Sequence, residues 1–211
     1  MMNPMLVTRE TGAKTMPIGM TVTTPGNEIT SAVLRNFAGA AKTNSVFLAN
    51  LMSSFASHER CGVHLYRVAA GITQFTKWRE RYQEFLAQTE DHIRILSDLT
   101  ALLGGDPQYV SPQARMAEFV NTRLMEPILL DGSVDSLTRE LTMLEAVLLA
   151  ESKCHANWEL LKRLADQMPE SSAKQALRHA VEIVADQEDA HVQWARNTWQ
   201  QAILAQLTAV G

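Results

Sequence analysis

Apolar side chains recur every three or four residues along four long stretches of this chain, and this spacing constrains the fold more than any other feature. Such a period places the apolar side chains on one face of an α-helix. Strand-like alternation is nearly absent from the sequence. We therefore predict an all-α fold with four long helices, at about residues 30–72 (with a break near 42–45), 75–103, 133–168 and 171–207.

The connections between these helices predict how they are arranged. Very short turns join the first helix to the second and the third to the fourth. The middle connection, residues 105–132, is far longer, follows a glycine-rich helix stop and contains a predicted short helix at 113–124. Two helical hairpins joined by a long crossover form a known four-helix-bundle topology. We predict a bundle domain at residues 28–211, preceded by an irregular N-terminal arm at residues 1–27.

A glutamate stands on the apolar stripe of the first predicted helix. Glu59 follows Met52 by seven residues and Phe55 by four, and Tyr66 follows Glu59 by seven. These spacings put all four side chains on one helical face. A carboxylate among core residues is costly unless it is paired or binds a metal. Glu59 is therefore either a buried structural acid or a ligand.

The other three apolar stripes carry residues of the same kind. His92 lies seven residues from apolar neighbours on either side, and Glu188 and His191 are three residues apart, so that they aim at one point. Glu151 lies on a stripe of leucines, namely Leu137, Leu141, Leu144 and Leu148. Carboxylates and imidazoles suit iron, manganese or zinc, and cations would compensate buried glutamates. We predict that Glu59, His92, Glu151, Glu188 and His191 are metal ligands.

With these residues in this order, the chain resembles the ferritin-like dimetal-carboxylate superfamily of the rubrerythrin and bacterioferritin type. That family has a single glutamate on each of two helices and Glu-x-x-His on each of the other two. Glu59 begins the family pattern of glutamate, six residues and tyrosine, and Glu151 is followed at the same distance by a tryptophan. Glu188 and His191 complete a Glu-x-x-His. The resemblance covers about residues 45–207 and implies a site for two iron or manganese ions.

The second helix departs from the family pattern. Its histidine, His92, is in place, but Thr89 stands where the family has glutamate. A threonine hydroxyl is a weak, neutral ligand, so we considered three substitutes. Gln88 lies four residues before His92, Glu90 is the neighbour of Thr89, and His155 lies four residues after the glutamate of the third helix. Without a substitute, the site would hold one metal ion or none.

Other residues near the predicted centre have simpler interpretations. We expect Tyr66 to be a core aromatic residue; the alternative is a residue next to the metal ligands, since a tyrosine near an oxidising metal can carry a radical or a hydrogen bond. Cys61 and Cys154 are expected to be buried and to pack as small hydrophobic residues. His58 and His64 fall off the apolar stripe, which places them at the surface or at an interface.

The composition excludes several functional classes. The net charge is −4 and the charges are interspersed, which argues against nucleic acid as a partner. The sequence contains no run of about 18 apolar residues, so we expect no membrane span. Two cysteines do not make a disulfide framework, and a reducing cytoplasm is the simplest interpretation.

These observations favour a cytoplasmic metalloprotein in which iron or manganese reacts with oxygen or peroxide, as in an oxidase or oxygenase. The motif does not identify the small-molecule substrate. The apolar helices and the N-terminal arm favour a homodimer. One alternative, which Thr89 favours, is a ferritin-like scaffold or binding module with a degenerate or mononuclear metal site. Iron storage is less favoured, because the cage-forming members of the family are usually shorter.

Overall fold

The computed structural model describes residues 4–7, 16–20, 44–129 and 134–209. Five helices lie in these ranges: α2 (Ser45–Ile72), α3 (Thr76–Leu102), α4 (Pro112–Leu129), α5 (Ser136–Gln167) and α6 (Ser172–Thr208). Two short strands, β1 (Pro4–Val7) and β2 (Met16–Met20), pair with each other in antiparallel orientation. The described part of the chain is thus helical apart from one strand pair, and the predicted all-α class is confirmed.

Local side-chain contacts explain where the helices begin and end. Asn44, Asp135 and Ser171 each accept a hydrogen bond from the backbone N–H three residues further on, at 3.1, 2.9 and 3.2 Å. Each contact satisfies one of the N–H groups that a helix leaves unpaired at its start. After α3, Gly104 adopts a positive φ of 87°, a conformation that favours glycine and ends the helix.

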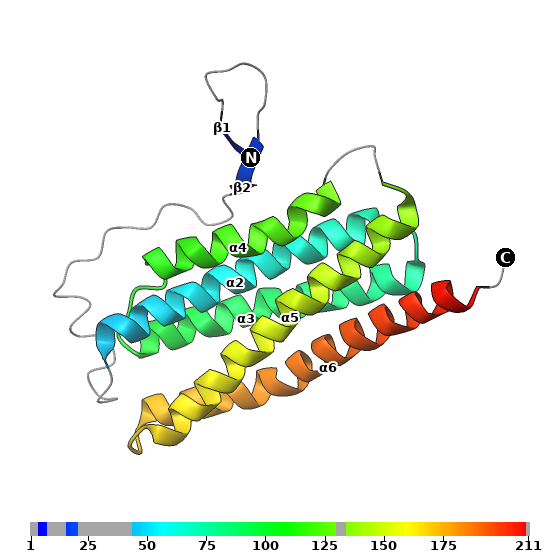
Figure 1. The fold of residues 1–211 in the computed structure, drawn as a ribbon. Coiled ribbons are helices and arrows are strands. Elements are labelled where there is room, and N and C mark those ends of the chain that lie inside the picture. The colour runs from blue at the N-terminus through cyan, green and yellow to red at the C-terminus, as the bar shows by residue number, and fades with distance from the viewer. Residues whose placement is uncertain (1–3, 8–15, 21–43, 130–133, 210–211) are drawn as a thin grey trace.

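The four long helices lie side by side as two hairpins (Figure 1). Helix α2 packs on α3 and α5 packs on α6, while α2 also meets α5 and α3 meets α6. The long crossover holds a longer helix than the sequence predicts, because α4 spans Pro112–Leu129 and packs along α2. Helix α4 therefore covers a face of α2 that the long helices leave open. Within the described ranges, no helix combines the length and apolarity needed to cross a membrane.

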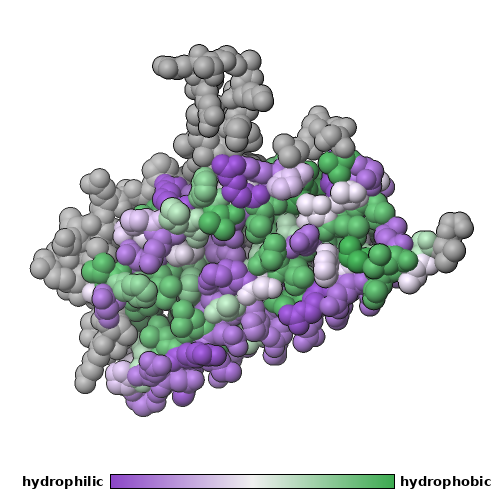
Figure 2. All heavy atoms as spheres, in the orientation of Figure 1, coloured by the Kyte–Doolittle hydropathy of each residue, from purple (hydrophilic) through white to green (hydrophobic). Residues whose placement is uncertain are grey.

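The core consists of two apolar clusters. One cluster includes Met52, Leu96 and Val184, and the other includes Tyr66 and Phe85. On α2, α3 and α6 the predicted ligands fall between these two clusters in the sequence. A polar centre therefore interrupts the core about halfway along the helices. Figure 2 shows hydrophilic side chains gathered along the lower edge, over α6, and apolar side chains across the middle of this face.

The N-terminal region differs in one respect from the predicted irregular arm. Within residues 1–27, β1 pairs with β2 in a register that places Leu6 opposite Pro17 and Val7 opposite Met16. A two-stranded pair consists only of edge strands, and edge strands tolerate proline. The rest of that arm lies outside the described residues, as does the stretch 30–43 that we assigned to the first helix.

Candidate metal site

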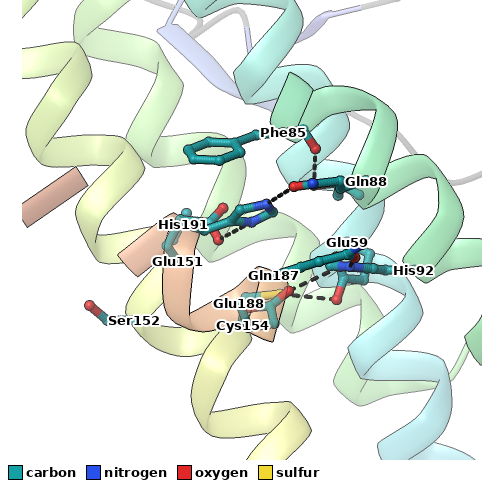
Figure 3. Close-up of polar contacts among 12 residues, drawn as sticks. Glu59, Phe85, Gln88, His92, Glu151, Ser152, Cys154, Gln187, Glu188 and His191 are labelled. Carbon is teal, nitrogen blue, oxygen red and sulfur yellow. Dashed lines mark hydrogen bonds and ion pairs between the residues drawn. The ribbon is translucent and has the colours of Figure 1, made fainter. Parts of the chain in front are cut away.

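The five predicted ligands converge at the polar centre from four helices (Figure 3). Their side chains are almost completely buried, with relative exposures between 0 and 3%. They form two groups, in each of which the ligand atoms lie within 4.8 Å of one another. One group is Glu59, His92 and Glu188, and the other is Glu151, Glu188 and His191. Each group could hold a metal ion, and Glu188 belongs to both.

In the first group, His92 faces two carboxylates. Its Nδ1 lies 3.0 Å from Oε1 of Glu188 and 3.8 Å from Oε2 of Glu59. Its other ring nitrogen, Nε2, lies 2.8 Å from the amide oxygen of Gln187. Because that oxygen can only accept, Nε2 carries a proton and donates it. Nδ1 is then the nitrogen that is directed toward the carboxylates.

The second group has the same arrangement, but its histidine comes from α6 and its glutamine from α3. Nδ1 of His191 lies 3.1 Å from Oε2 of Glu151, and its Nε2 lies 2.7 Å from the amide oxygen of Gln88. The histidine of α6 thus contacts a glutamine of α3, and the histidine of α3 contacts Gln187 of α6. In the sequence, each glutamine stands four residues before the histidine of its own helix. We missed Gln187, although the repeated Gln-x-x-x-His spacing could have identified it.

Two further side chains of α5 reach the centre. The indole N–H of Trp158 donates a hydrogen bond to Oε1 of Glu59 at 2.8 Å. The Sγ atom of Cys154 lies 2.9 Å from the same oxygen and 3.3 Å from Oε1 of Glu188. The expected burial of Cys154 is confirmed. Cys154 also belongs to the apolar cluster that includes Met52, which confirms that it packs as a small hydrophobic residue, while its Sγ atom contacts the two carboxylates.

Burial and mutual contacts shift the pKa values of these groups strongly. Burial would lower the pKa of His92, but contacts with Glu188 and Glu59 favour the imidazolium and raise it to about 10. Burial, together with the charges of Glu59 and Glu151, raises the pKa of Glu188 to about 7 despite its contact with His92. Burial also opposes ionisation of Glu59, yet its contacts with His92 and Cys154 leave its pKa lowered. In the absence of metal, a protonated His92 therefore partly compensates the carboxylates.

Thr89 does not contribute a donor to the centre. It is buried at 3% exposure, and its hydroxyl donates a hydrogen bond to the backbone oxygen of Phe85 at 2.8 Å. Its methyl group lies 3.4 Å from the position that a Cβ would occupy on Gly62, so α2 and α3 approach closely there. At this position the structure therefore has a contact between two helices and no carboxylate.

Of the proposed substitutes, Gln88 alone contacts the centre, through His191. His155 lies on the outer side of α5, where Nε2 is 2.8 Å from Oδ1 of Asp189 and the side chain is 33% exposed. Glu90 is exposed and pairs with Arg67 at 2.6 Å. His155 follows Glu151 by four residues, and we expected this spacing to direct its side chain toward the centre. The side chain instead points toward the outside of α5.

Tyr66 lies beside the second group, as expected. Its ring is completely buried and packs edge-on against the ring of His191, with centroids 6.1 Å apart. Burial, followed by the charge of Glu151, raises the pKa of its hydroxyl well above the ordinary value. The hydroxyl has no hydrogen-bond partner of good geometry among the described residues.

His58 departs from the expected surface position. Its side chain is 5% exposed, and Nε2 lies 3.0 Å from the backbone oxygen of Ala150. The reason is helix α4, whose Asn121 and Leu124 lie close to His58 on the face of α2 that the long helices leave open. His64 is half-buried.

The chemistry of the donors fits a bound cation. Oε2 of Glu59 and Oε2 of Glu188 are buried without a hydrogen-bond partner in the described parts of the chain. Carboxylates in such surroundings are costly unless a positive charge compensates them. Both histidines direct Nδ1 toward carboxylate oxygens, which requires a proton or a metal ion between two acceptors.

Comparisons of this chain with protein-family models, with curated proteins and with solved structures found no match.

Proposed function

We propose that this chain is a ferritin-like four-helix bundle whose polar centre holds two divalent metal ions, iron or manganese, for redox chemistry with oxygen or peroxide. The observation that carries the proposal is the pair of buried Glu and His groups that share Glu188. A shared carboxylate between two sets of oxygen and nitrogen donors is typical of two-metal sites in helical bundles. Carboxylate and imidazole donors together suit iron, manganese or zinc.

The residues divide between two positions. Glu59, His92 and Glu188 would hold one ion, and Glu151, Glu188 and His191 would hold the other. When bound, a redox-active metal supplies the electrons that reduce oxygen or peroxide. The three glutamates compensate the charge of the ions, and the apolar clusters on both sides exclude water from the centre.

The two glutamines orient the histidines. Each amide oxygen accepts the Nε2 proton of the histidine on the opposite helix, at 2.8 Å for Gln187 and 2.7 Å for Gln88. This contact fixes the tautomer, so that Nδ1 presents its lone pair to the ion. Because each contact joins α3 to α6, the same pair of hydrogen bonds also fixes the spacing of these two helices at the centre.

The test begins with metal binding. Metal-free protein is titrated anaerobically with ferrous iron or manganese, and bound metal per chain is measured by mass spectrometry. We expect two ions per chain in the wild type and a loss of metal in Glu151→Gln. Glu159→Gln is the matched control, because Glu159 lies on the same helix but its side chain is 55% exposed. Absence of bound metal in the wild type would refute the proposal.

The redox step is tested on the loaded protein. Oxygen or hydrogen peroxide is added, and its consumption is followed with an electrode in the wild type and in Glu151→Gln. Consumption that depends on Glu151 is expected. Bound metal without consumption would refute redox chemistry and leave a metal-binding protein.

A scaffold or binding role is the second candidate. It is favoured by Thr89, whose hydroxyl bonds its own helix and leaves the centre one carboxylate short of the family set. In that case the Glu and His residues form a hydrogen-bonded polar core, in which the glutamines and Trp158 satisfy part of the network. The metal titration separates the two candidates, because a scaffold with a degenerate or mononuclear site binds no metal or one ion per chain, whereas the first candidate binds two.

A further inference from the structure

Cys154 brings a sulfur atom into the polar centre, and the function proposed above does not use it. Its side chain is 4% exposed, and Figure 3 shows it beside Glu188. Its Sγ atom lies 2.9 Å from Oε1 of Glu59 and 3.3 Å from Oε1 of Glu188. A thiol has one proton to donate. A hydrogen bond from the thiol therefore explains one of these two contacts, and the other requires either a proton on the carboxyl group, which Glu188 with its pKa of about 7 can carry, or a nearby cation.

The second oxygens of these carboxylates accept no hydrogen bond from the described part of the chain, although Oε2 of Glu59 lies 3.8 Å from Nδ1 of His92. Oε2 of Glu59 and Oε2 of Glu188 lack hydrogen-bond partners in the described residues, and both side chains are at least 98% buried. The sulfur therefore lies among acceptors that need a positive charge.

The distances agree with neighbouring ligands of one metal ion. With bonds of about 2.1 Å to oxygen and about 2.3 Å to sulfur, two ligands at a right angle lie about 3.1 Å apart. The two measured sulfur–oxygen distances, 2.9 and 3.3 Å, fall on either side of that value. Nδ1 of His92 lies 3.0 Å from the same oxygen of Glu188, which adds a third donor at similar spacing.

We propose that Cys154 is a thiolate ligand of the metal ion held by Glu59, His92 and Glu188, an inference that rests on the proposed metal site. The thiol releases its proton to solvent as the sulfur–metal bond forms. Three carboxylates and one thiolate then carry four negative charges, which two divalent cations neutralise. Cys154 thus supplies the anionic donor that Thr89 does not.

This assignment makes the two halves of the centre chemically different. The position formed with Glu59 and His92 has oxygen, nitrogen and sulfur donors, whereas the position formed with Glu151 and His191 has only oxygen and nitrogen. Thiolate ligands favour softer ions such as zinc over manganese. The first position is therefore expected to be the more selective of the two.

Cobalt(II) tests the assignment, because a cobalt–thiolate bond gives a charge-transfer band in the near ultraviolet that oxygen and nitrogen ligands do not give. The chain has two cysteines, so Cys61→Ser leaves Cys154 as the only thiol. We expect the band in cobalt-loaded wild type and in Cys61→Ser. We expect no band in Cys154→Ser, which should still bind cobalt by mass spectrometry through the carboxylates and histidines.

The results distinguish failure of the thiolate assignment from failure of the metal site. Cobalt bound to Cys61→Ser without the band, or a band that persists in Cys154→Ser, would overturn the thiolate assignment and leave the metal site intact. Absence of bound cobalt in the wild type would overturn the metal site and the assignment together. If circular dichroism shows that Cys154→Ser is unfolded, the spectrum of Cys61→Ser decides the question by itself.

Discussion

Replacing Glu188 with glutamine is expected to stabilise the metal-free protein and to weaken the metal-loaded one. Glu188 is 1% exposed, and its pKa is raised to about 7, first by burial and then by neighbouring carboxylates. A raised pKa means that folding disfavours the ionised carboxylate. The stability that the protonated form provides is fully present below pH 4.5 and is lost as the pH rises through 7. Glutamine has the same shape and never ionises.

The size of the effect follows from the pKa. A rise from 4.5 to about 7 corresponds to about 3 kcal/mol at pH 8, since each tenfold change in an equilibrium constant is worth about 1.4 kcal/mol. The favourable contact with His92 is already included, because it lowers the same pKa. For a chain of this size, about 3 kcal/mol corresponds to a rise in Tm of roughly 6 to 12 °C.

Thermal unfolding of metal-free wild type and Glu188→Gln at pH 5 and pH 8 measures this effect. We expect most of the gain at pH 8 to disappear at pH 5, where Glu188 is protonated in the folded chain. Asp189→Asn is the control. Asp189 is the next residue in the sequence, but its carboxylate is exposed, so its replacement should change the free energy of unfolding by less than about 0.5 kcal/mol. A metal-free variant less stable than wild type at pH 8 would refute the electrostatic reasoning. With metal added, the order should reverse, because the variant loses the shared ligand.

Three further predictions concern the surroundings of the centre. Trp158→Phe removes the indole donor to Glu59 and should lower the free energy of unfolding, measured in urea, by about 1.5 to 3 kcal/mol; a loss below 0.5 kcal/mol would contradict the importance of this bond. Thr89→Val removes only the hydroxyl that bonds Phe85, so bound metal per chain should stay unchanged, and a decrease would make Thr89 a ligand. Burial raises the pKa of Cys61 to about 12, so iodoacetamide at pH 8 should label it only after unfolding; equal labelling of folded and unfolded chains, followed by mass spectrometry, would argue against this burial.

The spacing of apolar residues predicted the long helices well, because these helices carry long, regular apolar stripes. The two hairpin turns and the ends of α3 and α6 lie within two residues of the predicted bounds, where glycine, proline and capping side chains act locally. The extent of α4 could not be predicted in the same way. The buried face of α4 is the one that contacts α2. Because this contact is between segments distant in the sequence, the local spacing of apolar residues in α4 indicates its helix only weakly.

The stripe of α5 shows why the details of the centre were harder to predict. We followed the leucines, which led from Glu151 to His155. The buried positions instead follow the heptad that includes Val147, Glu151, Cys154 and Trp158, whereas Leu148 is only half-buried. Seven residues fall just short of two helical turns, so a heptad stripe rotates slowly around the helix and adjacent stripes differ by a small angle. That rotation moves His155 outward and brings Cys154 inward.

Because the polar centre lies between two apolar clusters, a metal ion bound there would be coupled to folding. The clusters pack α2, α3, α5 and α6 together at both sides of the centre. The centre itself subtracts from this stability at Glu188, whose carboxylate is buried with one oxygen lacking a hydrogen-bond partner among the described residues and whose pKa is raised to about 7. A bound cation would gain this carboxylate as a ligand, so Glu188, which destabilises the metal-free chain, would stabilise the loaded one. Meanwhile Gln88 and Gln187 hold the histidines in a binding orientation before any ion arrives, which reduces the ordering that binding must impose.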